Sequence, residues 1–281
     1  MSDETGLRYG MHDIPIDEYH ADKQFHTASM YKRFHKSPAL MTCTDTPANT
    51  SLSVGTLTHA LALQDDAQLE RIRAYDGVRR GKAYQQWKED LPPDAVECTI
   101  AEWDTAKRCA TALHEDRVIG ELLSTDRQGF VEKTICWYDK WEHPNYGYVM
   151  QDCKMRPDFL LLPQFTIVDI KTTATFSEHD LIRTIWKYGY QIQLAHYITG
   201  AASYFHRTLA DVRFVFAFVE TKEPYRTAAM MLDDDTIEKA LEQRTRIQRE
   251  FIKCVDLGDK FVDPLSDNLS VVSLPEFVFN D

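Results

Sequence analysis

The stretch RPDFLLLPQFTIVDIKTT, residues 156–173, decides the fold of this chain. It contains two runs rich in branched and aromatic residues, and the turn-like pair Pro163-Gln164 separates them. Runs of this composition on either side of a turn are typical of neighbouring β-strands. The stretch therefore predicts a β-hairpin.

Polar and apolar residues alternate along the second run of this hairpin. Successive side chains of a strand point to opposite faces, so Asp169 and Lys171 are expected to project together. Val168 and Ile170 then face the other way, into the core. The hairpin also brings Asp158, which precedes the first strand, alongside this pair. Two carboxylates and one ammonium group are thus predicted to meet at one place on the sheet.

Two carboxylates beside a lysine fit the cleavage of phosphodiester bonds. That reaction needs a hard cation held by oxygen ligands, a nucleophilic water and positive charge near the phosphate. We expect Asp158, Asp169 and the main-chain carbonyl of Ile170 to hold Mg²⁺, for which Mn²⁺ can substitute. Lys171 can orient or deprotonate the water, or stabilise the phosphate, and the sequence leaves these roles open.

A surface ion pair is the competing interpretation of the Asp169 and Lys171 pattern. The apolar residues that flank both positions argue against it. Charges embedded in such a strand are rarely buried without a partner or a metal ion.

Two further segments carry residue types that such a site uses. In QLAHY, Gln193 and Tyr197 lie four positions apart, so on a helix an amide and a phenol share one face. Glu132 opens the predicted strand VEKTICWY and alternates onto one face with Thr134. Glu132 could supply a carboxylate for a second metal ion about 3.5–4 Å from the first. An ordinary exposed strand glutamate is an equally open alternative.

A histidine lies within the apolar segment GTLTHALAL, residues 55–63, which predicts a buried helix. His59 stands among leucines, so its ring needs a partner. A hydrogen bond inside the core is the simplest one. Because candidate metal-binding carboxylates are present in the same chain, we favour His59 as a further metal ligand.

The remaining pattern predicts an α/β fold with a mixed central β-sheet flanked by helices. A continuous apolar run, VRFVFAFVE, predicts a central strand. Helices are expected from Ser29 to about Ser37, over residues 55–63, from a capping box of Thr99 and Glu102 to about His114, from Ser177 with an interruption at Gly189, and from Asp235 to about Cys254. Residues 1–25 predict an irregular arm, and residues 26–281 predict one domain with helical decorations.

Composition restricts the environment of the chain. The sequence has no apolar stretch of the roughly 18 residues that a membrane span needs, and its first residues do not have the pattern of a targeting segment. We therefore expect a soluble cytoplasmic protein. Six cysteines are scattered without a metal-binding spacing and predict free thiols. The net charge of −12 does not favour DNA binding, although a locally basic cleft can still steer DNA.

The order GTLTH, VEKTICWYD, RPD, DIK and QLAHY resembles the RecB-like branch of the PD-(D/E)XK nucleases. The resemblance is closest to the RecE-type exonucleases (exodeoxyribonuclease VIII-like) of phages and prophages, and it covers most of the chain. It implies a PD-(D/E)XK core and an active site of His59, Glu132, Asp158, Asp169 and Lys171. Gln193 and Tyr197 are then the supporting helix motif.

The same resemblance implies an activity and its partners. Such enzymes degrade linear double-stranded DNA with Mg²⁺, processively from the 5′ end, and leave single strands for homologous recombination. They form rings around the DNA, possibly tetramers here, and work with a single-strand annealing protein. A bacterial cytoplasm and a phage or prophage gene are the implied setting.

Basic residues near these motifs are candidate phosphate contacts. Lys154 and Arg156 precede Asp158, while Arg183 and Lys187 lie one turn apart on a predicted helix. Solvated surface charges are the alternative for all four.

Two other functions stay open on this fold. One is a structure-specific or restriction-like endonuclease, and the other is a catalytically silent DNA-binding module. A metabolic enzyme has no support, because the sequence lacks a Gly-rich phosphate loop, a GxSxG elbow and an HExxH motif.

Overall fold

The computed structural model describes residues 7–42, 54–92, 95–124, 128–143, 147–162 and 164–256. Its helices are α1 (Ile16–Ala21), α2 (Ala28–Lys36), α3 (Val54–Ala62), α4 (Asp66–Leu69), α5 (Lys82–Glu89), α6 (Ile100–Glu115), α7 (Arg117–Leu122), α8 (Glu178–Lys187), α9 (Tyr190–Tyr204) and α10 (Asp234–Asp256). Its strands are β1 (Gly10–His12), β2 (Ile72–Tyr75), β3 (Val96–Thr99), β4 (Gly129–Val131), β5 (Thr134–His143), β6 (Gly147–Met155), β7 (Phe159–Leu161), β8 (Thr166–Thr173), β9 (Arg213–Glu220) and β10 (Thr227–Met230).

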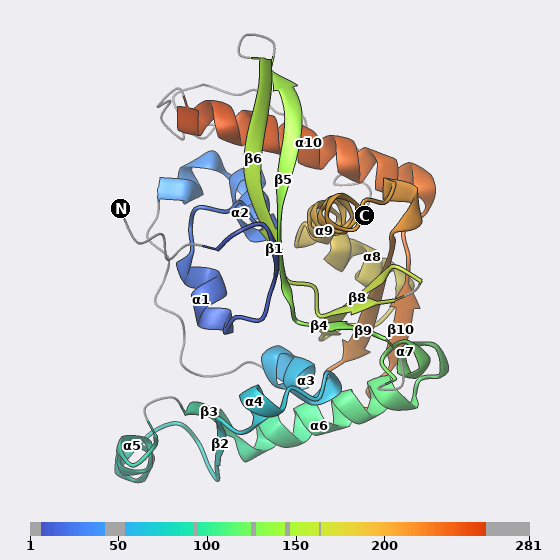
Figure 1. Ribbon diagram of the computed structural model, residues 1–281. Coiled ribbons are helices and arrows are strands. Elements are labelled where there is room, and N and C mark those ends of the chain that lie inside the picture. Colours follow the sequence, from blue (N-terminus) through green and yellow to red (C-terminus); the bar gives the residue numbers. More distant parts are fainter. Residues whose placement is uncertain are drawn as a thin grey trace, which may run out of the picture.

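A five-stranded mixed sheet forms the centre of the molecule, in the order β10-β9-β8-β7-β4 (Figure 1). The predicted hairpin is present as β7 and β8, which pair antiparallel with Phe159 opposite Val168. Strands β8 and β9 run parallel, and Asp169 lies opposite Phe216. A parallel pair needs a crossover, and α8 and α9 supply it. The predicted α/β fold with a mixed central sheet is confirmed.

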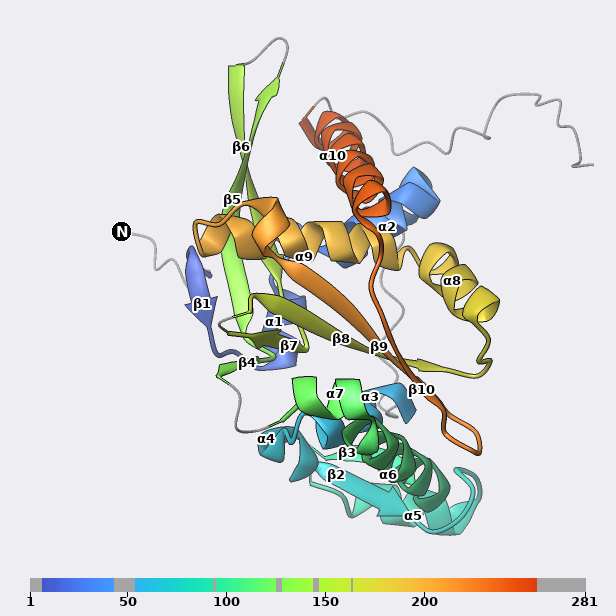
Figure 2. The same cartoon turned by 90° about the vertical axis from the view of Figure 1, so that its right-hand side faces the viewer.

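Helices cover both faces of this sheet, as Figure 2 shows with α9 on one side and α3, α6 and α7 on the other. Val168 and Ile170 belong to the apolar cluster that includes Leu113 of α6 and Ile119 of α7. Ile167 belongs instead to the cluster that includes residues of α8 and α9. The alternation of β8 therefore places Asp169 and Lys171 on the α9 side, as expected from the sequence.

The segment VEKTICWYD is not one strand. Strand β4 ends at Val131 and belongs to the five-stranded sheet, whereas β5 begins at Thr134 and belongs to a separate sheet of order β1-β5-β6. Glu132 lies between them with φ of 45°. Non-glycine residues rarely adopt this left-handed backbone conformation, and it turns the chain from one sheet to the other. The predicted alternation of Glu132 with Thr134 along a strand is thus wrong.

The first residues described are not irregular. Strand β1 pairs antiparallel with β5, from Gly10 opposite Cys136 to His12 opposite Thr134. Helix α1 follows and buries Tyr19 against the body of the protein. The expectation of an irregular arm over residues 1–25 is therefore wrong for the part that the structure describes.

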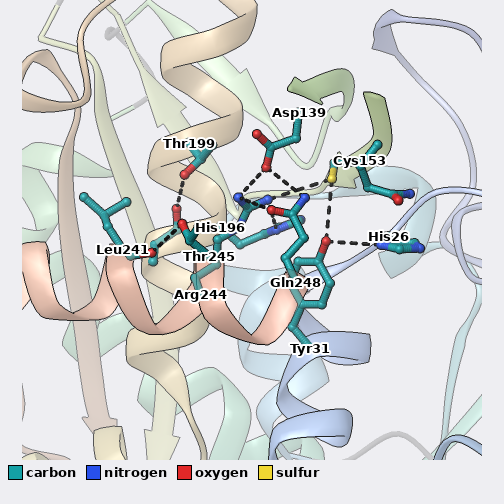
Figure 3. A network of polar contacts seen from close by, with 12 residues as sticks. His26, Tyr31, Asp139, Cys153, His196, Thr199, Leu241, Arg244, Thr245 and Gln248 are labelled. Atoms are coloured by element: carbon teal, nitrogen blue, oxygen red, sulfur yellow. Dashed lines mark hydrogen bonds and ion pairs between the residues drawn. The ribbon is translucent and has the colours of Figure 1, made fainter. Parts of the chain in front are cut away.

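A buried polar network attaches α10 to the rest of the fold (Figure 3). Arg244 of α10 is 3% exposed and forms an ion pair with Asp139 of β5. Gln248, one turn further, donates to the same carboxylate at 3.0 Å. The Arg244 guanidinium also lies 3.5 Å from Nδ1 of His196 on α9. Because an unpaired buried charge is costly, this network fixes α10 against both α9 and β5.

Local signals placed most helices correctly. Thr99 and Glu102 form the complete capping box that begins α6. The Ser177 side chain accepts from the Asp180 amide at the start of α8, and Gly189 has the left-handed conformation that separates α8 from α9. Asp233, rather than Asp235, accepts from the amide of Thr236 at the start of α10.

The structure describes five of the six cysteines, and these five form no disulfide: Cys98, Cys109, Cys136, Cys153 and Cys254. Cys43 and the last residues, 257–281, lie outside the described part of the chain. Within the described ranges, no helix combines the length and the hydropathy that a membrane crossing requires.

Candidate active site

Asp169 is the most deeply buried of the candidate acidic residues, with no exposed surface. Its Oδ1 accepts a hydrogen bond from Nε2 of Gln193 at 2.8 Å. Its Oδ2 lies 2.5 Å from Nζ of Lys171. That contact has the distance of an ion pair without hydrogen-bond geometry, and no other donor reaches Oδ2 within the described residues. One carboxylate oxygen is therefore held by α9, while the other has only an ammonium group beside it.

Asp158 lies between β6 and β7, directly before the hairpin. Its Oδ2 accepts from the amide of Ile170 at 2.7 Å, which fixes the carboxylate beside β8. The same oxygen lies 3.5 Å from Nδ1 of His59. Burial raises the pKa of Asp158, and the nearby Asp169 carboxylate raises it further, although His59 and Lys171 oppose the shift. The two carboxylates predicted to meet are thus close enough to influence each other's ionisation.

His59 reaches the same place from α3. Its Nε2 lies 2.8 Å from the carbonyl oxygen of Ile170. This contact is the core hydrogen bond that the sequence left open as the simplest partner. It also joins the ring to the carbonyl that we expect to bind metal, with Asp158 at the other ring nitrogen. The core hydrogen bond and the predicted metal ligation therefore both place the His59 ring beside the Ile170 carbonyl and Asp158.

Lys171 is largely buried beside these carboxylates, with its side chain 13% exposed. Burial alone would lower the pKa of Lys171, but Asp169 and Asp158 outweigh it and hold that pKa above its ordinary value. The ammonium group also lies 4.8 Å from the centre of the Tyr190 ring, a cation–π contact. Without a bound metal, Lys171 is therefore a cation at neutral pH.

The helix motif QLAHY points toward this cluster as predicted. Gln193 contacts Asp169 directly, as described above, and Tyr197 donates from its hydroxyl to the carbonyl of Arg156 at 3.1 Å. Arg156 precedes Asp158 by two residues, so Tyr197 fixes the segment that carries this carboxylate. Both side chains are positioning groups.

Glu132 approaches the cluster from the turn between β4 and β5. Its amide donates to the carbonyl of Asp158 at 3.0 Å, and its carboxylate pairs with Arg156 at 3.2 Å. Burial raises the pKa of Glu132, while Arg156 lowers it and Asp158 raises it. Glu132 is therefore a partly buried neighbour of Asp158, held by an arginine, rather than an exposed strand residue. A second metal ion at Glu132 stays a prediction.

Two residues that the sequence did not single out complete the surroundings. Lys32 of α2 donates from Nζ to Oε1 of Gln193 at 3.2 Å and lies 5.5 Å from the Tyr190 ring centre. Burial lowers the pKa of Lys32 to about 8, and Lys171 lowers it while Asp169 raises it. Tyr190 thus has an ammonium group of Lys32 and one of Lys171 near its ring. Only the folded arrangement relates Lys32 to α9, so no local pattern indicated it.

The four predicted phosphate contacts differ in position. Lys154 has no exposed surface, and its Nζ donates to the carbonyls of Tyr19 and Asp22, both at 2.7 Å. The prediction that Lys154 contacts DNA is therefore wrong, because its ammonium group holds the segment after α1. Arg156 is occupied by Glu132 and by the carbonyl of Ile14.

Arg183 and Lys187 of α8 are both exposed and remain candidates for phosphate contact.

The donor set fits a hard divalent cation. Asp158, Asp169 and the Ile170 carbonyl offer oxygen ligands, and Asp169 Oδ2 is buried without a hydrogen bond. In the described residues, His, Cys, Asp and Glu side chains form no ready-made cluster of three or more for a metal ion. The ammonium group of Lys171 and the ring of His59 lie at the carboxylates instead.

An aspartate before β7 and an Asp-x-Lys unit on β8, at one position of a mixed sheet, define the PD-(D/E)XK class of nuclease folds. The model of a family described as "PDDEXK-like domain of unknown function (DUF3799)" matches residues 27–260, and the chain belongs to this family. The predicted assignment to the PD-(D/E)XK superfamily is confirmed, and the finer RecE-type assignment stays a prediction.

A solved structure supports the fold. The crystal structure described as "Putative exonuclease" from Eubacterium rectale is 14% identical and has a TM-score of 0.61. The match covers 95% of this chain and 98% of that chain. A second structure, that of SSO0001, is 13% identical over 79% of this chain and 84% of that chain. Its TM-score of 0.28 is too low to support a shared fold. None of the curated proteins matches the chain.

Proposed function

We propose that this protein is a divalent-metal-dependent deoxyribonuclease that degrades linear double-stranded DNA from an end. One observation carries the proposal: Asp158, which precedes β7, comes together with Asp169, Lys171 and the Ile170 carbonyl of β8 at one position. Burying several charges close together costs folding free energy. Such a cluster is therefore a candidate for a functional site.

The residues of the site would have different roles in phosphodiester cleavage. Asp158, Asp169 and the Ile170 carbonyl would hold the metal, and His59 would join them as a ligand or orient the carbonyl. When bound, a divalent cation polarises the phosphate and makes a bound water more acidic. Gln193 keeps the Asp169 carboxylate in its orientation.

Lys171 acts as a cation in this proposal. The carboxylates of Asp169 and Asp158 raise the pKa of Lys171 in the metal-free protein, which supports a protonated side chain that can attract a phosphate. The second ammonium group, that of Lys32, supports an electropositive lining beside the carboxylates. The ammonium groups of Lys171 and Lys32 supply local positive charge at the site in a chain whose net charge is −12.

We further propose that the enzyme is RecE-like. The order of its motifs supports this assignment, and so does the fold shared with the Eubacterium rectale protein, whose description names an exonuclease. Digestion would then run from the 5′ end and be processive, in a ring of identical subunits that works with a single-strand annealing protein. Native mass spectrometry of the purified protein tests the ring, and strand-specific end labels test the polarity.

The decisive experiment compares linear with covalently closed circular duplex DNA. Purified protein is incubated with each substrate in Mg²⁺ or in EDTA, beside Asp169→Ala, and the release of nucleotides is followed. We expect loss of the linear DNA only, in Mg²⁺ only, and none with the variant. Thermal unfolding of the variant confirms that it is folded.

Two other results would replace the proposal. If circular DNA is cut as well, the enzyme is an endonuclease on the same fold. If no DNA is cut with Mg²⁺ or Mn²⁺ while DNA is still bound, the chain is a silent binding module.

A further inference from the structure

Helix α8 lies at the periphery of the molecule (Figure 2), and exposed aromatic and basic residues lie on it and directly after it. Trp186 is 73% exposed, more than any other large hydrophobic side chain in the described part of the chain. Tyr188 is 54% and Ile182 53% exposed. Arg183 and Lys187 are exposed on the same helix. These five residues are called the α8 surface below.

The helix has ordinary amphipathic packing on its other side. Leu181 and Ile185 are 2% and 5% exposed and lie in the core cluster of the central sheet. Ile182 and Trp186 lie one turn apart, so they form a single stripe directed away from that core. Core packing therefore does not account for Trp186. A solvent-exposed tryptophan with an exposed isoleucine one turn away is typical of a binding surface.

This surface is continuous with the candidate active site. The Tyr188 and Tyr190 rings are stacked, with centroids 5.8 Å apart and an interplanar angle of 28°. The Tyr190 ring in turn lies 4.8 Å from Nζ of Lys171. Lys187 also places its ammonium group 5.3 Å from the Tyr188 ring centre. The Lys187 ammonium group and the rings of Tyr188 and Tyr190 thus form a row that leads from the C-terminal end of α8 to Lys171 at the proposed site of cleavage.

The chemistry of the row favours one kind of occupant. Residues 181–190 include two cations and three large aromatic residues and no acidic residue, in a chain whose net charge is −12. Aromatic rings stack on nucleobases, and neighbouring lysine and arginine side chains follow the phosphates. A paired base offers no free face inside a duplex, so such a row fits unpaired nucleotides.

We propose that the α8 surface binds the single-stranded segment of the DNA substrate next to the cleavage site, by stacking its bases on Trp186 and Tyr188. Arg183 and Lys187 hold the phosphates of the same segment. This inference rests on the proposed nuclease function, because it assigns the surface to that enzyme's own substrate.

The test compares two DNA ligands and three variants of the full-length chain. Fluorescence anisotropy in EDTA measures the Kd for a blunt duplex and for the same duplex with a single-stranded overhang. The variants are the double substitution Trp186→Ala with Tyr188→Ala, the conservative pair Trp186→Phe with Tyr188→Phe, and Tyr148→Ala. Tyr148 of β6 is 66% exposed and serves as the matched control.

Base stacking contributes about 1–3 kcal/mol per base, so we expect the loss of two stacking rings in the alanine pair to weaken overhang binding by about thirtyfold or more. The blunt duplex should lose much less. The phenylalanine pair should restore most of the affinity, and Tyr148→Ala should bind as the unmodified protein does. Equal affinity of the alanine pair and the unmodified protein for the overhang overturns the proposal, and so does an equal loss on both ligands.

A loss of oligomer mass in the alanine pair, measured by native mass spectrometry, would assign the surface to contacts between copies and also overturn the proposal. Cleavage of linear DNA by the unmodified protein is measured in parallel. Absence of cleavage contradicts the proposed nuclease function. If the protein cleaves DNA but the alanine pair binds the overhang normally, only the proposed stacking surface is contradicted.

Discussion

Nε2 of His59 lies 2.8 Å from the carbonyl oxygen of Ile170, although 111 residues separate the two along the chain. This contact links α3 to the middle of β8, at the carbonyl expected to bind metal. We predict that His59→Ala raises the Mg²⁺ concentration needed for half-maximal cleavage by about tenfold or more, because ligand and outer-sphere substitutions typically cost that much in metal affinity. Cleavage rates measured over a Mg²⁺ titration check this. An unchanged half-maximal concentration would mean that His59 is only a core residue.

Removal of the Gln193 amide should affect both the stability and the activity of the protein. Gln193→Ala leaves the buried Oδ1 of Asp169 without its donor, and an unsatisfied buried group costs about 1–3 kcal/mol. Urea unfolding measures the loss of free energy, and a cleavage assay measures the expected fall in rate. Gln191→Ala, on the same helix but bonded to Gln243, is the matched control and should retain activity. Equal effects of both substitutions would contradict a special role for Gln193.

The lowered pKa of Lys32 predicts that the rate of DNA cleavage falls at alkaline pH. Its pKa is lowered to about 8, so the free protein loses this positive charge as the pH rises through that value. A cation that attracts a phosphate is then lost, and kcat/KM should fall above about pH 8. Lys32→Arg should keep kcat/KM high at alkaline pH, because a guanidinium does not deprotonate in this range. Lys36→Arg, an exposed position on the same helix, should leave the pH profile unchanged. A limit that survives in Lys32→Arg belongs to another group.

Substitution of Lys154 should change the stability of the protein, whereas substitution of Lys187 should change its DNA binding. Lys154→Met leaves the carbonyls of Tyr19 and Asp22 without their donor and the Asp22 carboxylate without its ion-pair partner, so unfolding should become easier by about 2–4 kcal/mol. DNA affinity of the folded variant should stay unchanged. Lys187→Met should leave stability within about 0.5 kcal/mol and reduce the salt dependence of DNA binding by about one unit of slope. Chemical denaturation and binding at several salt concentrations measure both effects. Loss of DNA affinity in a folded Lys154→Met would restore that residue as a contact.

Local patterns sufficed wherever the determining interactions are short in range. The alternation around Asp169 and Lys171 predicted which face each side chain takes, since strand geometry alone sets it. The capping box of Thr99 and Glu102 likewise specified the start of α6 from four residues. The hairpin and the QLAHY helix were predicted for the same reason.

Contacts between distant segments could not be predicted in this way. Lys154 looks like any basic residue before a motif, and its burial depends on the carbonyls of Tyr19 and Asp22, which lie more than a hundred positions earlier. Lys32 is recognised only through its contact with Gln193, 161 positions away. The break at Glu132 follows from a left-handed backbone that no glycine marks, so a continuous strand was the natural expectation.

The parallel pairing of β8 with β9 has a consequence during synthesis of the protein. Every candidate active-site residue has been added to the chain once Tyr197 is in place, yet the strand that flanks β8 on one side ends only at Glu220. Asp169 lies opposite Phe216 in that pairing. The strand that carries Asp169 and Lys171 therefore lacks its parallel partner until β9 has emerged from the ribosome. A chain that ends before β9 would thus carry Asp158, Asp169 and Lys171 without the strand that supports them.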